Sequence, residues 1–144
     1  MSWAWGNSMS VGNESIDSEH KSLFIMLNGI ENTIKSKDSD ALLQALQVFA
    51  ESTRKHFENE ENIARAINFP FEEHKQEHEY VLNEMQIMWD ELASHEDRWS
   101  ESVIEHYYEF LTEWTMAHIR GDDMQMKEVL KDYPYDFTPP VSPG

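Results

Sequence analysis

The sequence predicts an all-α protein, an up-down-up-down four-helix bundle with an irregular N-terminal arm and a short C-terminal helix. Glycine and proline number only 5 each among 144 residues, too few for a turn-rich β fold. Four long segments repeat apolar residues at intervals of three and four, and short polar breaks separate these segments. We therefore expect a single domain over residues 1–144, with an arm at 1–16, a helical bundle at 17–131 and a Pro-rich tail at 132–144.

The arm contains Trp3 and Trp5 in a stretch where Asn7, Gly12 and Asn13 interrupt any helical period. We expect these tryptophans to pack over the outside or one end of the core. An arm that binds a partner is the alternative.

The helix boundaries follow from capping residues and polar breaks. Asp17 and Ser18 are both good N-cap residues and predict the start of the first helix. A short last helix is expected after Gly121, opened by Asp122 or Asp123, and the tail is expected to be frayed or draped over the surface. The expected helices are 17–36, 40–67, 71–93, 101–119 and 124–131. The prolines of the tail are Pro134, Pro139, Pro140 and Pro143.

Composition excludes several classes of function. The formal net charge of -17 makes nucleic acid and anionic membrane surfaces poor partners, because both require basic patches. Cysteine is absent, so disulfides and thiolate ligands are excluded. No apolar run reaches the roughly 20 residues of a membrane span, and the N-terminus lacks the features of a signal peptide. We expect a cytoplasmic protein.

Most of the histidines fall on the inward faces of the predicted helices. Two pairs with a spacing of four lie on one helix face each, His56 with Glu60 and His74 with His78. Buried imidazoles need hydrogen-bond partners and a buried carboxylate needs neutralising, and a metal provides both. The predicted inward histidines are His20, His56, His74, His78 and His118, whereas His95 and His106 are expected on the surface.

The donor set narrows the choice of metal. A single zinc ion takes four ligands. The predicted inward histidines and carboxylates are more than four, so they suit a pair of ions. Imidazole with carboxylate favours iron, copper, zinc or manganese over calcium or magnesium. The Glu-x-x-His pairs of ferritin-type di-iron bundles are absent, because no glutamate stands three residues before any histidine. A zinc-peptidase reading of His74 to His78, with Glu77 as general base, leaves His20, His56 and His118 unexplained.

These residues together resemble the hemerythrin family, most closely the single-domain bacteriohemerythrins, from about Trp5 to Asp123. The opening, centre and close of the family pattern stand here as Val11-Gly12, Ile16-Asp17, His20-Lys21, Leu23-Phe24, His56-Phe57, Glu60-Glu61, Phe69-Pro70, His74, His78, Trp114, His118-Ile119 and Asp123.

The resemblance implies a non-haem di-iron site with an oxo or hydroxo bridge, which binds O₂ reversibly. By match to the family, His74, His78 and His118 hold one iron and His20 and His56 hold the other. Glu60 and Asp123 bridge the pair, and O₂ binds at an open position on the second iron. The match and the spacing to the ligands also give an apolar lining for the O₂ pocket, namely Leu23, Phe57, Trp114 and Ile119, and they place Thr115 at the same pocket.

The last carboxylate is ambiguous by spacing. Asp122 is four residues from His118 and would share its face of a straight helix, whereas Asp123 is about 140° out of register. The family pattern prefers Asp123. We choose Asp123, and expect Gly121 to let the helix break and the chain turn before the carboxylate.

Three residues depart from the family pattern: Glu19 where glutamine is frequent, Ala64 where methionine is common, and Thr115 where leucine is usual. We expect none of them to contact a metal ligand. Thr115 has two interpretations. Its hydroxyl faces the site and hastens autoxidation, or it bonds to the carbonyl of Leu111 and leaves only a methyl group toward the pocket.

The leading hypothesis is a reversible O₂ binder for storage, delivery or scavenging. The alternatives are an O₂, redox or iron sensor, and a di-iron redox enzyme that acts on Fe²⁺, peroxide or nitric oxide. We favour the binding protein over the catalyst. Dioxygen is the expected partner, and the sequence identifies no redox or oxygen-consuming protein partner.

Overall fold

The computed structural model describes residues 5–94 and 100–139, and its described residues form helices and no strand. The long helices are α1 (Glu14–Ser36), α2 (Ser39–Ala66), α3 (Glu72–Ser94) and α4 (Glu101–Ala117), and the short C-terminal helix is α5 (Lys127–Leu130). The all-α prediction is therefore confirmed. The expectations for Trp3, His95, Pro140 and Pro143 concern positions outside the described residues.

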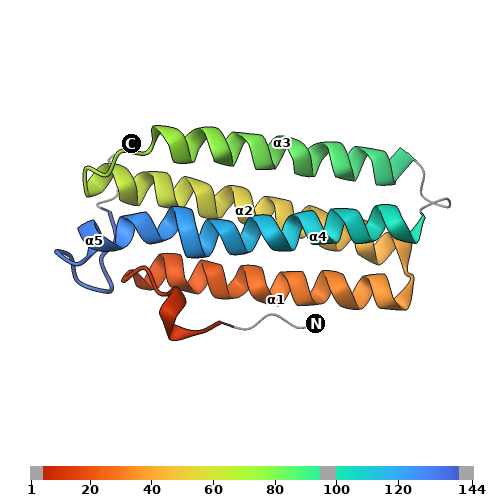
Figure 1. The fold of residues 1–144 in the computed structure, drawn as a ribbon, viewed down its shortest axis with the longest axis horizontal. Coiled ribbons are helices and arrows are strands. Elements are labelled where there is room, and N and C mark those ends of the chain that lie inside the picture. The colour runs from red at the N-terminus through yellow and green to blue at the C-terminus, as the bar shows by residue number, and fades with distance from the viewer. Residues whose placement is uncertain (1–4, 95–99, 140–144) are drawn as a thin grey trace.

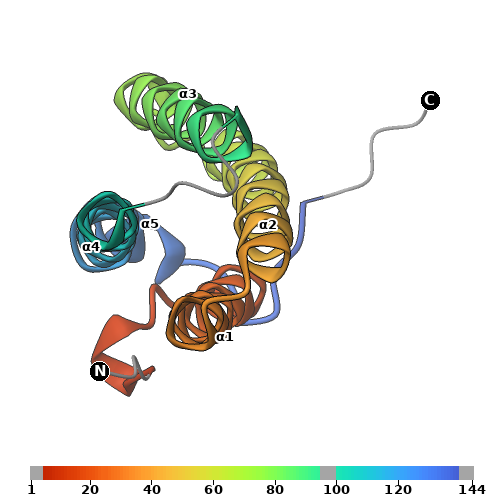
Figure 2. The ribbon, with the colours of Figure 1, turned by 90° about the vertical axis from the view of Figure 1, so that its right-hand side faces the viewer.

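Consecutive long helices run in opposite directions along the molecule (Figure 1). The end view places the four helices around a common interior, with α1 beside α2, α2 beside α3 and α4 facing them (Figure 2). This arrangement is the expected up-down-up-down bundle. Within the described ranges, no helix is both long and apolar enough to cross a membrane.

The first helix begins earlier than predicted. Its N-cap is Asn13, whose side-chain oxygen accepts a hydrogen bond from the backbone N–H of Ile16 at 3.1 Å. Asp17 is instead buried inside the first turn, where it accepts hydrogen bonds from the Ser10 hydroxyl at 2.5 Å and the Val11 N–H at 3.0 Å. Both residues can cap a helix, and the tertiary contact of Asp17 with the arm leaves the cap to Asn13.

The described part of the tail is draped, and it packs against the start of α1. The carbonyl of Tyr135 accepts a hydrogen bond from the Glu14 N–H at 2.8 Å, and the carbonyl of Phe137 accepts one from the Asn13 amide at 3.0 Å. The Tyr135 hydroxyl also donates to Asp17 at 2.9 Å. The arm and the described part of the tail therefore both contact the N-terminal end of α1.

Two apolar clusters fill the interior, and the predicted site residues lie between them in sequence. On α1, Ile16 belongs to one cluster and Leu23 to the other, with His20 between them. Glu60 on α2 likewise lies between Phe57 and Ile63. Trp5 packs against the cluster that contains Leu23, as expected for the arm. The bundle interior thus has a polar layer, which contains the predicted site residues, between the two apolar clusters.

The contact of Asn13 with the tail gives a test of this fold. We expect Asn13→Ala to lower the free energy of unfolding by about 2 kcal/mol, because it removes a helix cap and leaves the partly buried Phe137 carbonyl without its Asn13 partner. Asp38, the exposed N-cap of α2, is the matched control, and Asp38→Ala should cost about 1 kcal/mol. Urea unfolding measures both values. Equal costs for the two caps would show that the tail contact at Asn13 adds no stability.

Candidate metal centre

Five buried side chains from distant parts of the sequence converge in the polar layer. They are His20 from α1, His56 and Glu60 from α2, His118 directly after the end of α4, and Asp123 five residues further on, at the start of a short 3-10 helix (Asp123–Met126). One ligand atom from each lies within 4.8 Å of all the others. This group, called here the five-residue cluster, contains only imidazole nitrogens and carboxylate oxygens.

The shortest contacts in the cluster join histidines to carboxylates. Nε2 of His20 lies 2.6 Å from Oδ2 of Asp123, and Nε2 of His56 lies 2.6 Å from Oε1 of Glu60. Nε2 of His118 lies 2.9 Å from Asp123 and 3.2 Å from Glu60. The Nε2 atoms therefore all point inward, as a shared cation would require.

The two histidines of α3 lie beside this cluster. Nε2 of His78 is 3.4 Å from Oε2 of Glu60, the carboxylate oxygen on the other side from His56. His74 is buried one turn earlier, with its ring centroid 6.2 Å from that of His78. The prediction assigns His118 to the same iron as His74 and His78, whereas the structure places His118 in the cluster with His20 and His56. The distances therefore do not separate the ligands into the two predicted sets, and that division stays a prediction.

Asp123 enters the cluster through an unexpected local structure. Residues His118–Asp122 form a π-helical turn, and the N–H of Asp123 bonds to the carbonyl of His118. In such a turn the hydrogen bonds join residues five apart, which brings Asp123 over His118. The choice of Asp123 agrees with this geometry, but the predicted reason was wrong. The described positive-φ residues do not include Gly121, so the chain makes no left-handed turn there and continues as a helix with a wider turn.

Unpaired buried atoms test whether the cluster suits a metal. Oε2 of Glu60, Oδ1 of Asp123 and Nε2 of His78 are buried without a hydrogen-bond partner. Each such atom costs roughly 1–3 kcal/mol when left unsatisfied. Anionic oxygens and an imidazole nitrogen are what a transition-metal ion accepts as ligands, so the residues present fit a metal.

The charges of the cluster shift the pKa values of its histidines. Burial lowers the pKa of His118, but Asp123 and Glu60 outweigh it and raise that pKa to about 10. Burial likewise lowers the pKa of His56, and the carboxylates, Glu60 foremost, raise it well above its usual range. Burial dominates at His78 and lowers its pKa to about 4, so this imidazole is neutral at pH 7 with a nitrogen ready for a metal.

The pKa of Glu60 moves in the opposite direction. Burial raises it, but the imidazolium charges of His56 and His118 outweigh burial and hold the pKa well below its usual range. Glu60 is therefore an anion at neutral pH despite its complete burial. An anionic carboxylate with one unpaired oxygen is a ligand in its binding form.

One expectation about the departures from the family pattern was wrong. Glu19 does contact a predicted ligand, because its Oε1 accepts a hydrogen bond from Nδ1 of His56 at 2.8 Å. Sequence reasoning missed it because Glu19 precedes His20 on α1 but meets a histidine of α2. Ala64 is buried in the apolar cluster around Ile63.

Thr115 adopts the second of its two predicted arrangements. Its hydroxyl donates to the carbonyl of Leu111 at 2.7 Å, and the residue is fully buried. This bond is the usual one between a threonine and the carbonyl four residues earlier in a helix. The hydroxyl proton is therefore engaged within α4.

Aromatic rings cover the histidines on the side of α3 and α4. The Phe57 ring stacks on His78 with centroids 3.6 Å apart, and the half-buried Trp114 ring stacks on His118 at 4.8 Å. Leu23 and Ile119 are buried in the same apolar cluster as Phe57. His106 is exposed, as predicted. Whether an O₂ pocket is lined by Leu23, Phe57, Trp114, Thr115 and Ile119 stays a prediction.

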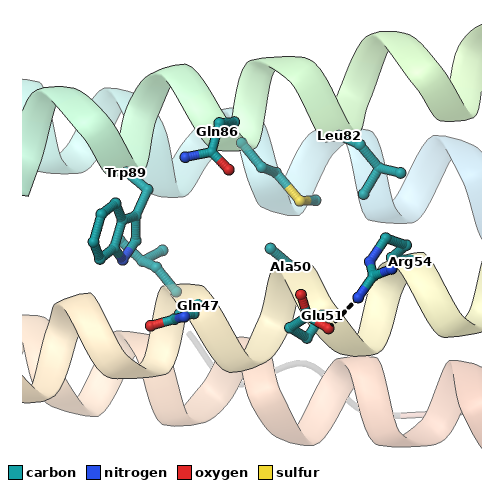
Figure 3. A pocket seen from close by; sticks show the side chains of 9 residues that line it. Gln47, Ala50, Glu51, Arg54, Leu82, Gln86 and Trp89 are labelled. Atoms are coloured by element: carbon teal, nitrogen blue, oxygen red, sulfur yellow. Dashed lines mark hydrogen bonds and ion pairs between the residues drawn. The ribbon is translucent and has the colours of Figure 1, made fainter.

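A separate groove of about 230 Å³ lies between α2 and α3 (Figure 3). Leu82 and Trp89 from α3 face Ala50 and Arg54 from α2 across it, and Arg54 pairs with Glu51 at 2.5 Å. None of the predicted site residues lines this groove. The residues that could hold a metal thus lie inside the bundle and not in this groove.

The fold and the cluster define a class, a helical-bundle metal-binding protein whose ligands are histidine and carboxylate. Within that class, the family model described as the hemerythrin HHE cation binding domain matches residues 11–130, so the chain belongs to the hemerythrin family.

Relatives from bacteria and eukaryotes align along most of the chain. A hemerythrin-like protein of Naegleria gruberi is 28% identical over 127 residues, covering 88% of this chain and 92% of the relative. A bacteriohemerythrin of Stenotrophomonas maltophilia is 25% identical over 136 residues, covering 92% and 84%. Hemerythrin subunit alpha of Lingula anatina is 29% identical over 126 residues, covering 87% and 92%.

The raised pKa values predict proton release on metal binding. His118 and His56 carry protons at pH 7 in metal-free protein, and a metal on Nε2 must displace them. Calorimetry of metal binding in buffers of different ionisation enthalpy should therefore show the release of one proton from each of these two imidazoles. The same shifts predict that affinity rises with pH up to about 10, since fewer protons then compete. A binding enthalpy that is independent of the buffer would contradict this.

The two adjacent aspartates allow a direct comparison. We expect Asp123→Ala to reduce the bound metal per chain at least tenfold under competition with a chelator, because it removes a carboxylate that contacts His20 and His118. Asp122→Ala, which alters the residue that helical spacing favoured, should keep the wild-type metal content. Loss of metal in Asp122→Ala with retention in Asp123→Ala would show that the wrong carboxylate had been chosen.

Proposed function

We propose that this protein binds O₂ reversibly at a non-haem di-iron centre, for oxygen storage, delivery or scavenging. In this proposal His74, His78 and His118 would hold one iron, and His20 and His56 would hold the other. Glu60 and Asp123 would each serve as a carboxylate ligand to both irons, which would also share an oxo or hydroxo group. The pair of ions, when bound, supplies the two electrons that O₂ takes up. Membership of the hemerythrin family supports this assignment.

The observation that carries the proposal is the position of Glu60. Its Oε1 lies 2.6 Å from Nε2 of His56, and its Oε2 lies 3.4 Å from Nε2 of His78. The two oxygens of one buried carboxylate therefore face histidines on different helices. A carboxylate placed in this way suits a bridge between two ions better than a ligand to one.

The surroundings of the cluster suit a reversible binder. Burial of all five cluster residues keeps bulk water from the reacting atoms, and the stacked rings of Phe57 and Trp114 close the site on the α3 and α4 side. The bond from Thr115 to Leu111 keeps that hydroxyl proton occupied. A dry site with few free protons favours return of O₂ over its loss as peroxide.

Anaerobic spectroscopy tests the proposal. Protein loaded with Fe²⁺ should contain two irons per chain, develop visible absorption under O₂ and lose it again under argon. Glu60→Ala should bind less than half of the iron and show no reversible absorption, because it removes the carboxylate between the two sets of histidines. His106→Ala is the matched control, since that histidine is exposed, and should behave as the wild type.

Other outcomes would assign other functions. One zinc per chain without oxygen-dependent absorption would sink the di-iron proposal. Steady consumption of O₂ or peroxide without a build-up of the absorbing form would replace the binding protein by a redox enzyme. Reversible absorption that is accompanied by a change in assembly would favour a sensor.

A further inference from the structure

We propose that Glu19 is a positioning residue, which fixes His56 for metal binding and whose negative charge makes the site favour the more oxidised metal. The inference rests on the proposed function, because it concerns the iron that His20 and His56 would hold. It concerns a carboxylate outside the five-residue cluster, one layer behind the ligands.

Glu19 contacts the back of the His56 ring. Its Oε1 lies 2.8 Å from Nδ1 of His56, while Nε2 on the opposite side of the same ring lies 2.6 Å from Glu60 in the cluster. A carboxylate at Nδ1 keeps the ring proton on that nitrogen, so that the lone pair of Nε2 points to the metal. The orientation of the ring is fixed by the same contact.

Glu19 is itself held in place. The side-chain amide of Asn59 donates to Oε1 of Glu19 at 2.8 Å, and it also lies 2.8 Å from the Ser15 hydroxyl. Asn59 is three residues after His56 on α2, so the same helix carries the imidazole and the amide that steadies its carboxylate partner. The arrangement ties α1 to α2 directly behind the cluster.

The position of Glu19 allows its charge to act on the site. Its side chain is 33% exposed, which keeps the carboxylate hydrated, whereas the His56 side chain is 1% exposed. Charges near the protein interior interact several times more strongly than in bulk water. Negative charge behind His56 makes the imidazole a stronger donor and favours the ion with the larger positive charge.

Among the described residues, the other two histidines of the cluster have no such partner. Nδ1 of His20 and Nδ1 of His118 are buried, and no described group forms a hydrogen bond with either atom. Glu19 therefore supports one of the three cluster imidazoles selectively. We infer that His56 is the most strongly donating of the three, and that the metal it holds is the one whose oxidation Glu19 favours.

Two substitutions separate position from charge. Glu19→Ala removes the acceptor at Nδ1 of His56, and should weaken Fe²⁺ binding by about 10–100-fold in competition with a chelator. Glu19→Gln keeps an oxygen at the same place without the charge. It should bind Fe²⁺ within a few-fold of the wild type, but shift the midpoint potential of the loaded site to more positive values and slow its autoxidation several-fold.

Glu58→Gln is the matched control, because Glu58 lies on α2 two residues from His56 and its side chain is 66% exposed. It loses the same charge and should leave affinity and potential unchanged. Circular dichroism of the metal-free variants verifies folding, and the NMR signal of the His56 ring proton should shift in both Glu19 variants and not in Glu58→Gln.

The outcomes distinguish this inference from the proposed function. Wild-type protein that binds two irons, together with a Glu19→Ala variant of wild-type affinity, would overturn the positioning role and leave the site intact. An unchanged potential in Glu19→Gln would overturn the role of the charge. Wild-type protein that binds no iron would overturn the proposed function, and this inference with it.

Discussion

The structure depends on the burial of two carboxylates, Glu60 and Asp123, at the centre of a helical bundle. Both side chains are completely buried, and an isolated carboxylate there would cost far more than a small domain can supply. Burial raises the pKa of Glu60, but the positive charges of the His56 and His118 imidazoles, which lie against these oxygens, outweigh burial and lower it. This requirement for positive charge explains why the helices bring histidines, and not more leucines, to the level between the two apolar clusters.

The fold and much of the cluster could be predicted from the sequence, because helical spacing is a local property. His56 and Glu60 are four positions apart, which places them on the same face of a helix, and the structure places their ligand atoms 2.6 Å apart. The position of Asp123 needed the family pattern, because a π-helical turn changes the register that spacing assumes. No local pattern predicted this turn.

Contacts between elements account for the remaining differences between the predicted and the observed structure. The start of α1 was misplaced because Asp17, a good cap by itself, is bound by Ser10, Val11 and the tail residue Tyr135. Glu19 was underestimated for the same reason, since its partner His56 is 37 residues away in the sequence. Capping and ligand support both depend on which helix lies alongside, and a single sequence does not give that arrangement.

A buried charged cluster is weak support for stability, since well-packed apolar residues of similar volume often stabilise a fold as well or better. Here the cluster and the neighbouring His78 also leave three inward ligand atoms without a hydrogen bond, on Glu60, Asp123 and His78. A π-helical turn adds a further departure from regular helix in the same place. These costs fall together on a few residues, while the flanking apolar clusters are conventionally packed. The simplest physical reason is a cation that offsets these costs when it binds.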